Sequence, residues 1–438
     1  MDLVSCDHRA PWLSSLPTRW SNKPLKYLAA INRMALPEST PQDQTIRYID
    51  ISSVNSLGEV VNIEAMPFGN APSRARRVAR HGDTIVSTVR TYLRAVASIP
   101  EDDTDLIAST GFAVVTPGPD LHPGFLSHWL RGNLFVDEVC ARSVGVSYPA
   151  TNASEVGCIP VPVPPLPIQR AIADFLDRKT AAIDALIEKK QKLLDLLTEK
   201  RAALINQAVT KGLDPNVPMK DSGIPWIGEI PAHWEVKRLK HISPRQTVGV
   251  VVNPSSYVED AGEVPFIYGS EVSEGRIDAA DARRISHESN GKLSKSQLRA
   301  GDLVCVRVGD PGVTAVVPPE LDGMNCGSIM IVRQAPTFDS DWLCYAMNSK
   351  AGRQNVWLVA YGAAQKQYNI GHAVDFVYPV PPLHEQSRIA SMLTSAEARF
   401  RLVTDILREQ QLRLQEYRQA LITAAVTGQF EIAQEDAG

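Results

Sequence analysis

The sequence lacks long hydrophobic runs, paired cysteines and a large excess of either charge. No stretch of about 18 apolar residues occurs in its 438 residues, so we expect no segment that spans a membrane. Residues 1–7 do not combine a basic start with an apolar stretch, so we expect no secretory signal and a cytoplasmic protein. The formal net charge of −4 excludes a protein covered in basic residues, but a local basic surface would suffice to bind nucleic acid.

The six cysteines are scattered along the chain and form no Cys-x-x-Cys pair. Such spacing is typical of buried free thiols in a reducing cytosol rather than of a disulfide framework or a metal site. We therefore expect free thiols at all six positions, which are Cys6, Cys140, Cys158, Cys305, Cys326 and Cys344.

Signatures of common active sites are also missing. The sequence contains no Gly-Lys-Ser/Thr phosphate loop, no His-Glu-x-x-His, no Gly-x-Ser-x-Gly and no Cys/His metal set. The Asn-Pro-Pro-aromatic loop of an amino-methyltransferase is absent, and Asn-Pro-Ser-Ser at 253–256 is better interpreted as a turn. We expect no catalytic residue, metal or cofactor in this chain, although an enzyme with an unrecognised site, such as a fused methyltransferase, is an alternative.

The sequence contains an internal duplication. Pro-Val-Pro-Pro-Leu at 162–166 returns at 379–383, a shift of 217 residues (379 − 162). The same shift relates Gln169 to Gln386, and Ala-Val-Thr at 208–210 to Ala-Val-Thr at 425–427. Trp20 and Trp234 open the two copies at a shift of 214 (234 − 20). A period above 200 residues is too long for a solenoid, so it indicates a duplicated domain pair.

Composition divides each copy into a globular region and a long helix. Short β-rich segments with Pro and Gly between them, and one amphipathic helix near 123–140, indicate an α+β fold. The expected order is a globular region at 1–165, a long helix at 166–210, a linker at 211–229, a second globular region at 230–380, a second long helix at 381–430 and a tail at 431–438.

Both long segments carry an apolar stripe at steps of three and four residues. A helix of about 40 residues is roughly 60 Å long, more than an ordinary packing helix. The two stripes are expected to pair as an antiparallel coiled coil if the copies are related by a pseudo-twofold axis, with a parallel pair as the alternative. The residues proposed for this pairing and for partner binding are Ile172, Leu176, Ile183, Leu186, Leu193 and Leu197, and Ile389, Leu393, Phe400, Val403, Leu414 and Leu421.

Each globular region contains a cluster of basic and hydrogen-bonding residues. Arg and Lys neutralise phosphates, while Arg, Gln and Asn also recognise base edges. The alternative for any one residue is a solvated charged surface. The candidates for DNA binding are Arg74, Arg76, Arg77, Arg90, Tyr92 and Arg94 in the first region, and Lys292, Lys295, Arg307, Gln365 and Lys366 in the second.

Two segments carry a resemblance to a known family. The segment Ser-Gly-Ile-Pro-Trp-Ile-Gly-Glu-Ile-Pro-Ala-His-Trp at 222–234 and Pro-Pro-Leu-His-Glu-Gln at 381–386 stand in a chain ordered globular–helix–globular–helix. Together they resemble the specificity subunit of type I restriction-modification systems, over essentially the whole chain. The sequence departs from the repeated pattern at Ile168, where the second copy has Glu385, and at residues 10–13, a weaker version of 224–227.

The resemblance implies a non-catalytic subunit that recognises DNA for a system of bacterial defence. Each globular region, a target recognition domain, would bind one half of a split, asymmetric sequence in double-stranded DNA. The helices would fix the distance between the half-sites and bind two methyltransferase (modification) subunits. Those partners would carry S-adenosylmethionine, and restriction/motor subunits would use ATP and Mg. A coiled-coil protein scaffold that never binds DNA is the other alternative.

Overall fold

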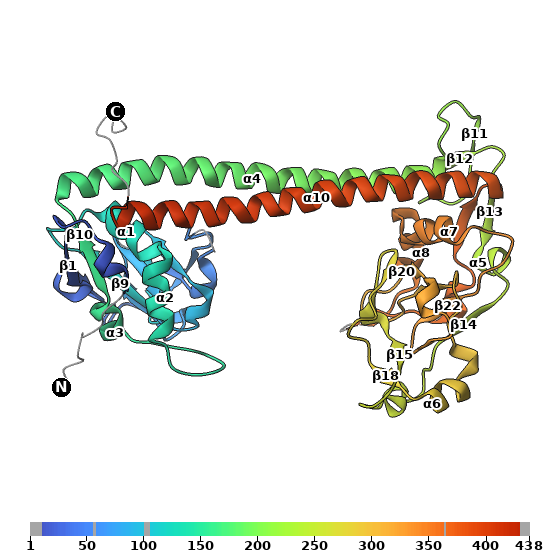
Figure 1. The fold of residues 1–438 in the computed structure, drawn as a ribbon, viewed down its shortest axis with the longest axis horizontal. Helices are drawn as coiled ribbons and strands as arrows, with labels where there is room; N and C mark the ends of the chain where they lie inside the picture. Colours follow the sequence, from blue (N-terminus) through green and yellow to red (C-terminus); the bar gives the residue numbers. More distant parts are fainter. Residues whose placement is uncertain (1–10, 56–57, 100–105, 363–364, 430–438) are drawn as a thin grey trace. The chain divides into compact units, whose positions relative to one another are not determined.

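The structure is a computed structural model that describes residues 11–55, 58–99, 106–362 and 365–429 (Figure 1). The tail expected at 431–438 lies outside these residues. The chain forms two compact units: unit 1 combines residues 1–190 and 408–438, and unit 2 comprises residues 191–407. Each unit holds one globular head and one half of each long helix. Within the described part of the chain, no helix is long and apolar enough to cross a membrane.

The first head is built on two four-stranded sheets. One has the order β2-β9-β6-β7 and the other β4-β3-β8-β5, with β3 and β8 parallel. The strands are β2 (Ala29–Ile31), β3 (Thr45–Ile49), β4 (Glu64–Pro67), β5 (Ala75–Val78), β6 (Thr84–Ser87), β7 (Val96–Ser98), β8 (Leu106–Ser109) and β9 (Phe112–Pro117). The strands expected near 84–89 and 111–115 are confirmed as β6 and β9.

Three short helices accompany these sheets: α1 (Pro123–Arg131), α2 (Asn133–Ala141) and α3 (Ala153–Cys158). The prediction of one helix near 123–140 is wrong, because the chain breaks at Gly132, which has extended backbone angles. A Cβ atom at Gly132 would lie 3.2 Å from the carbonyl oxygen of Trp129, closer than such contacts usually come. The aromatic and aliphatic side chains of α1 form part of the core of this head, including the fully buried Phe125 and Trp129.

The second head repeats this plan. Its four-stranded sheet has the order β14-β22-β19-β20, and a three-stranded sheet has the order β18-β15-β21, with β15 and β21 parallel. The strands of these sheets are β14 (Gln246–Val248), β15 (Val264–Ile267), β18 (Arg284–Ile285), β19 (Leu303–Cys305), β20 (Thr314–Val316), β21 (Asn325–Cys326) and β22 (Met330–Val332). The main helices are α7 (Ser340–Asn348), α8 (Lys350–Val359) and α9 (Ile370–Ala373). The remaining elements are β11 (Met219–Asp221), β12 (Glu229–Pro231), α5 (Leu239–Ile242), β16 (Val272–Ser273), β17 (Arg276–Ile277) and α6 (His287–Lys292).

The duplication is confirmed by strand register. In the first head, β1 (Ser21–Pro24) pairs antiparallel with β10 (Pro160–Val163), and in the second, β13 (Glu235–Arg238) pairs antiparallel with β23 (Val377–Val380). Both pairs contain a repeated Pro-Val strand, and each leads directly to a long helix. Asn152 caps α3 and Asn369 caps α9, each accepting a hydrogen bond from a backbone N–H three residues later.

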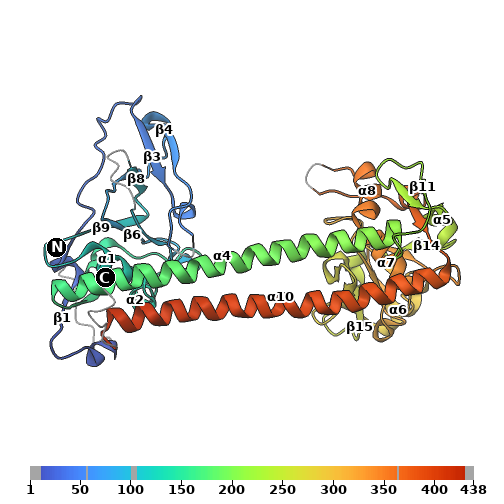
Figure 2. The same cartoon turned by 90° about the horizontal axis from the view of Figure 1, so that it is seen from above.

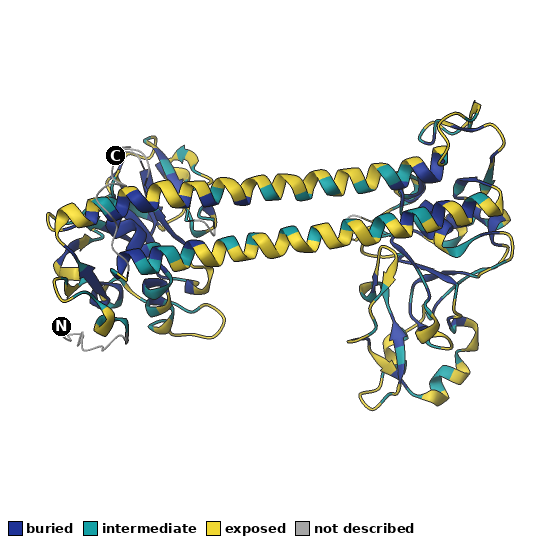
Figure 3. Cartoon of the chain, turned by 45° about the horizontal axis from the view of Figure 1, so that its top comes forward, coloured by how far each residue is buried: buried dark blue, intermediate teal, exposed yellow. Residues whose placement is uncertain are grey.

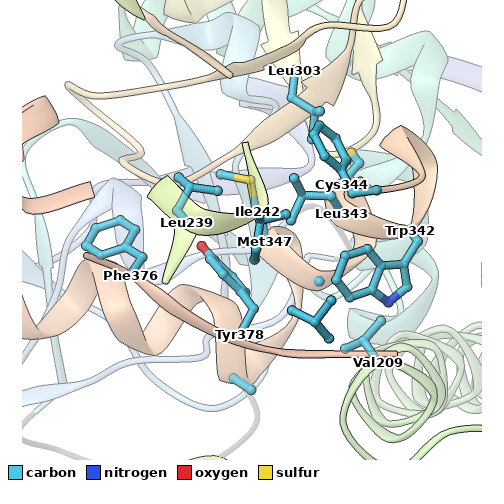
Figure 4. Close-up of a cluster of buried hydrophobic side chains, with 14 of the residues drawn as sticks. Val209, Leu239, Ile242, Leu303, Trp342, Leu343, Cys344, Met347, Phe376 and Tyr378 are labelled. Carbon is cyan, nitrogen blue, oxygen red and sulfur yellow. The ribbon is translucent and has the colours of Figure 1, made fainter. Parts of the chain in front are cut away.

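The long helices are α4 (Leu166–Lys211) and α10 (Leu383–Val426), and they are antiparallel within each unit. In unit 1 the start of α4 shares a hydrophobic core with the end of α10, through Leu176 and Ile422 among others. In unit 2 the end of α4 shares a core with the start of α10; Figure 4 shows Val209 of α4 among the side chains of that core, with Trp342. The expected antiparallel pairing is therefore confirmed, and Figure 2 shows both helices along their length.

A buried glutamine at the start of each long helix holds that helix to its own head. Gln169 accepts a hydrogen bond from the His122 N–H (2.8 Å) and donates to the carbonyls of Asp120 (3.0 Å) and Pro164 (2.8 Å). Gln386 accepts from the Asp339 N–H and donates to the Pro381 carbonyl, both at 2.8 Å. The two glutamine side chains are almost fully buried, so their amide groups depend on these hydrogen bonds, and the bonds to the Pro164 and Pro381 carbonyls are themselves buried.

The seam between the helices differs from the predicted stripe. Leu186, Leu193 and Val403 are exposed, whereas the other nine predicted residues are buried or half-buried. Figure 3 shows the mixture of exposed, half-buried and buried positions along both long helices. The polar side chains of the seam form cross-helix contacts: Lys190 with Gln410 (2.6 Å) and Arg418 with Asp184 (2.9 Å) in unit 1, and Arg201 with Glu397 (2.6 Å) in unit 2. Positions that are three to four residues apart fit two neighbouring stripes equally well, so the sequence pattern alone did not decide which one faces the other helix.

The cysteines are not all free. Cys140, Cys305, Cys326 and Cys344 are free thiols, and burial raises the pKa of Cys326 and Cys344 to about 12. Cys158 is disulfide-bonded, so the prediction of a free thiol is wrong at this position. Cys6 lies outside the described residues.

Candidate nucleic-acid interface

In the first head, four segments that are far apart in sequence meet along one edge. The turn between β8 and β9 forms backbone hydrogen bonds to two other segments. The Thr110 N–H donates to the Arg74 carbonyl, and the Thr88 N–H donates to the Gly111 carbonyl, both at 2.8 Å. The Thr151 N–H donates in turn to the Thr88 carbonyl at 2.8 Å. Arg74, the segment after β6 and the loop between α2 and α3 therefore belong to one continuous surface.

That loop contains a short hairpin, residues 144–150, which we call the first hairpin. Val144 and Ala150 exchange backbone hydrogen bonds of 2.9 and 3.0 Å, and Val89 also bridges to Ala150. Gly145 has φ = 114°, a conformation that L side chains rarely adopt. Figure 1 shows the segment between α2 and α3 projecting from the first head.

Two arginines stand in the turn that supports the first hairpin. Arg90 (φ = 51°) and Arg94 (φ = 54°) are left-handed residues on either side of the 3-10 turn Thr91–Leu93. The Arg90 guanidinium lies 5.1 Å from the centre of the Tyr148 ring. Arg94 donates to Asp137 (2.8 Å) and Asn133 (2.9 Å) on α2. Backbone strain of this kind is frequent at functional sites, and here it presents the exposed Tyr92 between two cations.

The other three arginines of the predicted cluster differ in their surroundings. Arg74 donates to the Tyr48 hydroxyl (3.0 Å) and pairs with Asp50 (2.5 Å), and these contacts raise its pKa. Arg76 lies 4.8 Å from the centre of the Phe68 ring. The Arg77 Nε atom is buried and has no hydrogen-bond partner among the described residues. The structure therefore brings Arg74, Arg90, Tyr92 and Arg94 to one edge, whereas Arg76 and Arg77 lie along β5.

The second head contains an equivalent hairpin. Residues 361–367, of which 363 and 364 lie outside the described part, form the second hairpin: Tyr361 and Gln367 exchange backbone hydrogen bonds of 2.9 and 2.8 Å. Val308 bridges to Gln367 just as Val89 bridges to Ala150 in the first head. Gly362 has φ = 107°, matching Gly145. The backbone hydrogen bonds, the β-bridge and the positive-φ glycine that define the hairpin are thus the same in both heads.

The predicted residues of the second head fall into two groups. Gln365 and Lys366 are exposed on the second hairpin, and the Lys366 ammonium lies 4.1 Å from the centre of the Trp357 ring. Arg307 supports this hairpin by donating to the carbonyl of Tyr368 at 3.2 Å. Lys292, which pairs with Glu288 at 2.5 Å, and the exposed Lys295 belong instead to α6 and the turn after it.

Sequence reasoning missed three exposed side chains at these sites: Val146, Tyr148 and Trp357. Their exposed fractions are 100%, 67% and 54%. None is charged, so a search for basic clusters passed over them. The available signal was the duplication itself, because Gly145 and Gly362 stand 217 residues apart (362 − 145) at the start of both hairpins. Among the described residues, no group of three or more His, Cys, Asp or Glu side chains could hold a metal ion.

Comparison with known proteins shows what the whole chain is similar to. The sequence model of the type I restriction modification DNA specificity domain matches residues 17–195. The chain is 22% identical over 302 residues to the MjaVIII specificity subunit of Methanocaldococcus jannaschii, covering 67% of each protein. It is 23% identical over 319 residues to the EcoBI specificity subunit of Escherichia coli, covering 70% of this chain and 65% of the relative.

Solved structures share the fold over nearly the whole chain. A chain from a study of complex assembly and conformational transition in the type I R-M system has a TM-score of 0.74 at 22% identity, covering 95% of this chain and 99% of that one. The HsdS subunit of Thermoanaerobacter tengcongensis has a TM-score of 0.51 at 22% identity, covering 95% and 98%. With two heads of one plan, antiparallel long helices and these relatives, the chain is similar to the specificity subunits of type I restriction-modification systems, and residues 17–195 match the DNA specificity domain of that family.

Proposed function

We propose that this chain recognises a bipartite, asymmetric sequence in double-stranded DNA, with one half-site for each head. The observation that carries the proposal is the pair of equivalent hairpins whose frames match and whose side chains differ. Residues at equivalent positions are Val144 and Tyr361, and Tyr148 and Gln365, each 217 apart (361 − 144 and 365 − 148). A common frame with different side chains suits two domains that bind DNA in the same way and recognise different bases.

The charges around the hairpins support DNA as the ligand. Arg90 is exposed and, among the described residues, forms no ion pair, so its charge is available to a phosphate. Arg74 and Arg94 are held by Asp50 and Asp137 and would act mainly by shaping the turn. Tyr92, Gln365 and Lys366 are exposed and can reach DNA without a rearrangement of the fold.

Exposed apolar residues on the long helices support a role in assembly. Within unit 1 these are Leu186, Leu412 and Tyr417, and within unit 2 Leu193, Leu196, Leu402, Val403 and Ile406. Exposed apolar rows on helices are typical of protein–protein contacts. We propose that each unit binds one methyltransferase (modification) subunit, and that restriction/motor subunits join the same complex.

Catalysis and its cofactors belong, on this proposal, to the partner subunits. The chain itself recognises the target and is not the enzyme; S-adenosylmethionine, ATP and Mg would be bound by the methyltransferase and restriction/motor subunits. Because the complex acts on chromosomal DNA, we place it in the cytoplasm.

The proposal is tested by the methylation motif of the complex with single substitutions in each head. We expect Arg90→Ala to relax or lose only one half of the motif and Lys366→Ala to affect only the other half. Lys23→Ala, at an exposed position on β1, is the control and should leave the motif intact. A motif that no hairpin substitution changes would contradict the assignment of the surface. Absence of sequence-specific DNA binding would favour the scaffold alternative, and binding of S-adenosylmethionine by the isolated chain would favour a fused methyltransferase.

A further inference from the structure

The first hairpin exposes a group of apolar side chains that the structure does not cover. Val144, Val146 and Tyr148 have exposed fractions of 81%, 100% and 67%. The hairpin contains no charged residue between positions 143 and 150. Leaving several apolar side chains in water is unfavourable compared with burying them, so their grouping on one projecting element indicates a surface that is covered in a complex.

The hairpin is held in place before any ligand binds. Its two ends exchange backbone hydrogen bonds, Val89 bridges to one of them, and the Thr91 hydroxyl contacts the Ser143 hydroxyl at 2.8 Å. A preformed two-stranded element loses little conformational freedom on binding. The tip can therefore contribute to selectivity rather than only adapt to a surface.

The charges beside the hairpin identify the class of ligand. Arg90 lies over the Tyr148 ring, and Arg94 is four residues further along the same turn. Arg94 is neutralised by Asp137, so Arg90 supplies the cation beside the apolar tip. A cation beside an apolar tip matches a DNA groove, where phosphates line the edges and bases form the floor. The major groove is about 12 Å wide and admits a two-stranded ribbon. There the apolar group on offer is the C5-methyl group of thymine.

We propose that the first hairpin recognises thymine methyl groups in the major groove through Val146 and Tyr148, while Arg90 holds the tyrosine ring and faces the phosphates. This inference rests on the proposed function and adds the chemistry by which the first half-site is recognised. The second hairpin has Gln365 and Lys366 in its described part, which suit hydrogen-bond acceptors and donors of purines. The two half-sites thus differ because one hairpin contacts methyl groups and the other forms hydrogen bonds.

The experiment uses the complete chain with its methyltransferase subunits and a DNA duplex that carries the methylated motif. In one duplex every thymine of the first half-site is replaced by uracil, which lacks only the methyl group; in a second duplex the replacement is made in the other half-site. Binding is measured for the wild type, for Val146→Ala and for Val61→Ala. Val61 is a matched control because it is 60% exposed in the same head but lies outside the hairpin.

We expect uracil in the first half-site to weaken wild-type binding about four- to tenfold, because each methyl contact contributes about fourfold. Val146→Ala should weaken binding to the unmodified duplex by a similar factor and should respond less to uracil, whereas Val61→Ala should behave as the wild type. Equal responses of the wild type and Val146→Ala to uracil would overturn the inference. So would a first half-site without an A·T pair, or a Val146→Ala variant that fails to assemble with its partners but binds DNA normally.

Failure of the inference and failure of the proposed function give different results. If the wild-type complex shows no preference for any duplex sequence, the proposed function is wrong. If it binds one motif tightly and ignores the methyl groups, the proposed function stands and only the inference about the hairpin is wrong.

Discussion

A buried ion pair at the end of α10 gives a quantitative prediction about the helix pair. The Arg418 side chain is 4% exposed and pairs with Asp184 of α4, which is 22% exposed, at 2.9 Å. Arg131 is close by: burial and, after it, the charge of Arg418 lower its pKa to about 10, while Asp184 acts in the opposite direction. Asp184 therefore attracts both arginines in the core of unit 1, and Glu59 and Asp177 also attract Arg131.

This arrangement predicts unequal effects of removing each partner. Removing one member of a buried pair usually costs about 3–5 kcal/mol. For Arg418→Met we expect about 2–3 kcal/mol, because Asp184 keeps the attraction of Arg131 and the repulsion between the arginines disappears. For Asp184→Asn we expect the full loss of about 3–5 kcal/mol, because the buried Arg418 loses its ion-pair partner while the repulsion between Arg418 and Arg131 remains.

Hydrogen exchange of the backbone amides at the end of α10 measures this effect locally. A change of about 2–3 kcal/mol in the opening equilibrium corresponds to exchange that is about 30- to 150-fold faster. Arg413→Met is the control, because Arg413 pairs with Glu409 on the same helix with exposed fractions of 74% and 59%. Exposed pairs contribute little, so exchange should change at most about twofold. Similar exchange in Arg418→Met and Arg413→Met would refute the reasoning.

Three further predictions concern the pH dependence of stability, the start of α4 and assembly with the methyltransferase subunit. Burial lowers the pKa of His128 despite its 2.8 Å hydrogen bond to Asp177. Unit 1 should therefore lose stability as the pH falls below about 6.5, by at most about 1.4 kcal/mol per pH unit. His128→Gln should abolish this pH dependence in urea unfolding followed by circular dichroism. Gln169→Met should leave the buried Pro164 carbonyl without this partner and remove two part-buried bonds, so it should lower the free energy of unfolding of unit 1 by about 1–3 kcal/mol in the same assay. No loss would contradict the role of Gln169. Leu193→Asp, at an exposed position, should prevent co-purification of the methyltransferase subunit without faster hydrogen exchange in α4. Leu197→Asp, at a half-buried position, should also speed hydrogen exchange in α4. Intact assembly with Leu193→Asp would contradict the proposed docking surface.

The architecture followed from the sequence where identical residues have identical roles. Gln169 and Gln386 stand in both copies because each satisfies backbone groups at the start of a long helix. The duplication therefore predicted the two heads, the two helices and their antiparallel pairing. The break at Gly132 was missed because its flanking residues keep a helical apolar pattern, and only the extended backbone angles of Gly132 separate α1 from α2.

The site was harder to predict, because its geometry depends on contacts between distant segments. The pattern of arginines at 74–94 gave no sign that Asp50 pairs with Arg74 and that Asp137 pairs with Arg94. The sequence equally gave no sign that residues 144–150 lie against the turn that carries Arg90. The charge pattern pointed to the turn that carries Arg90, which stays a prediction, whereas the hairpin packed against that turn came only from the structure.

Genome-wide mapping of methylated adenines tests the central claim most directly. Cells with this chain and its methyltransferase subunits are compared with cells that lack only this chain. The account predicts that one split, asymmetric methylated motif disappears in the deletion and returns with the wild-type chain. An active methyltransferase whose methylation pattern is the same with and without this chain would contradict it.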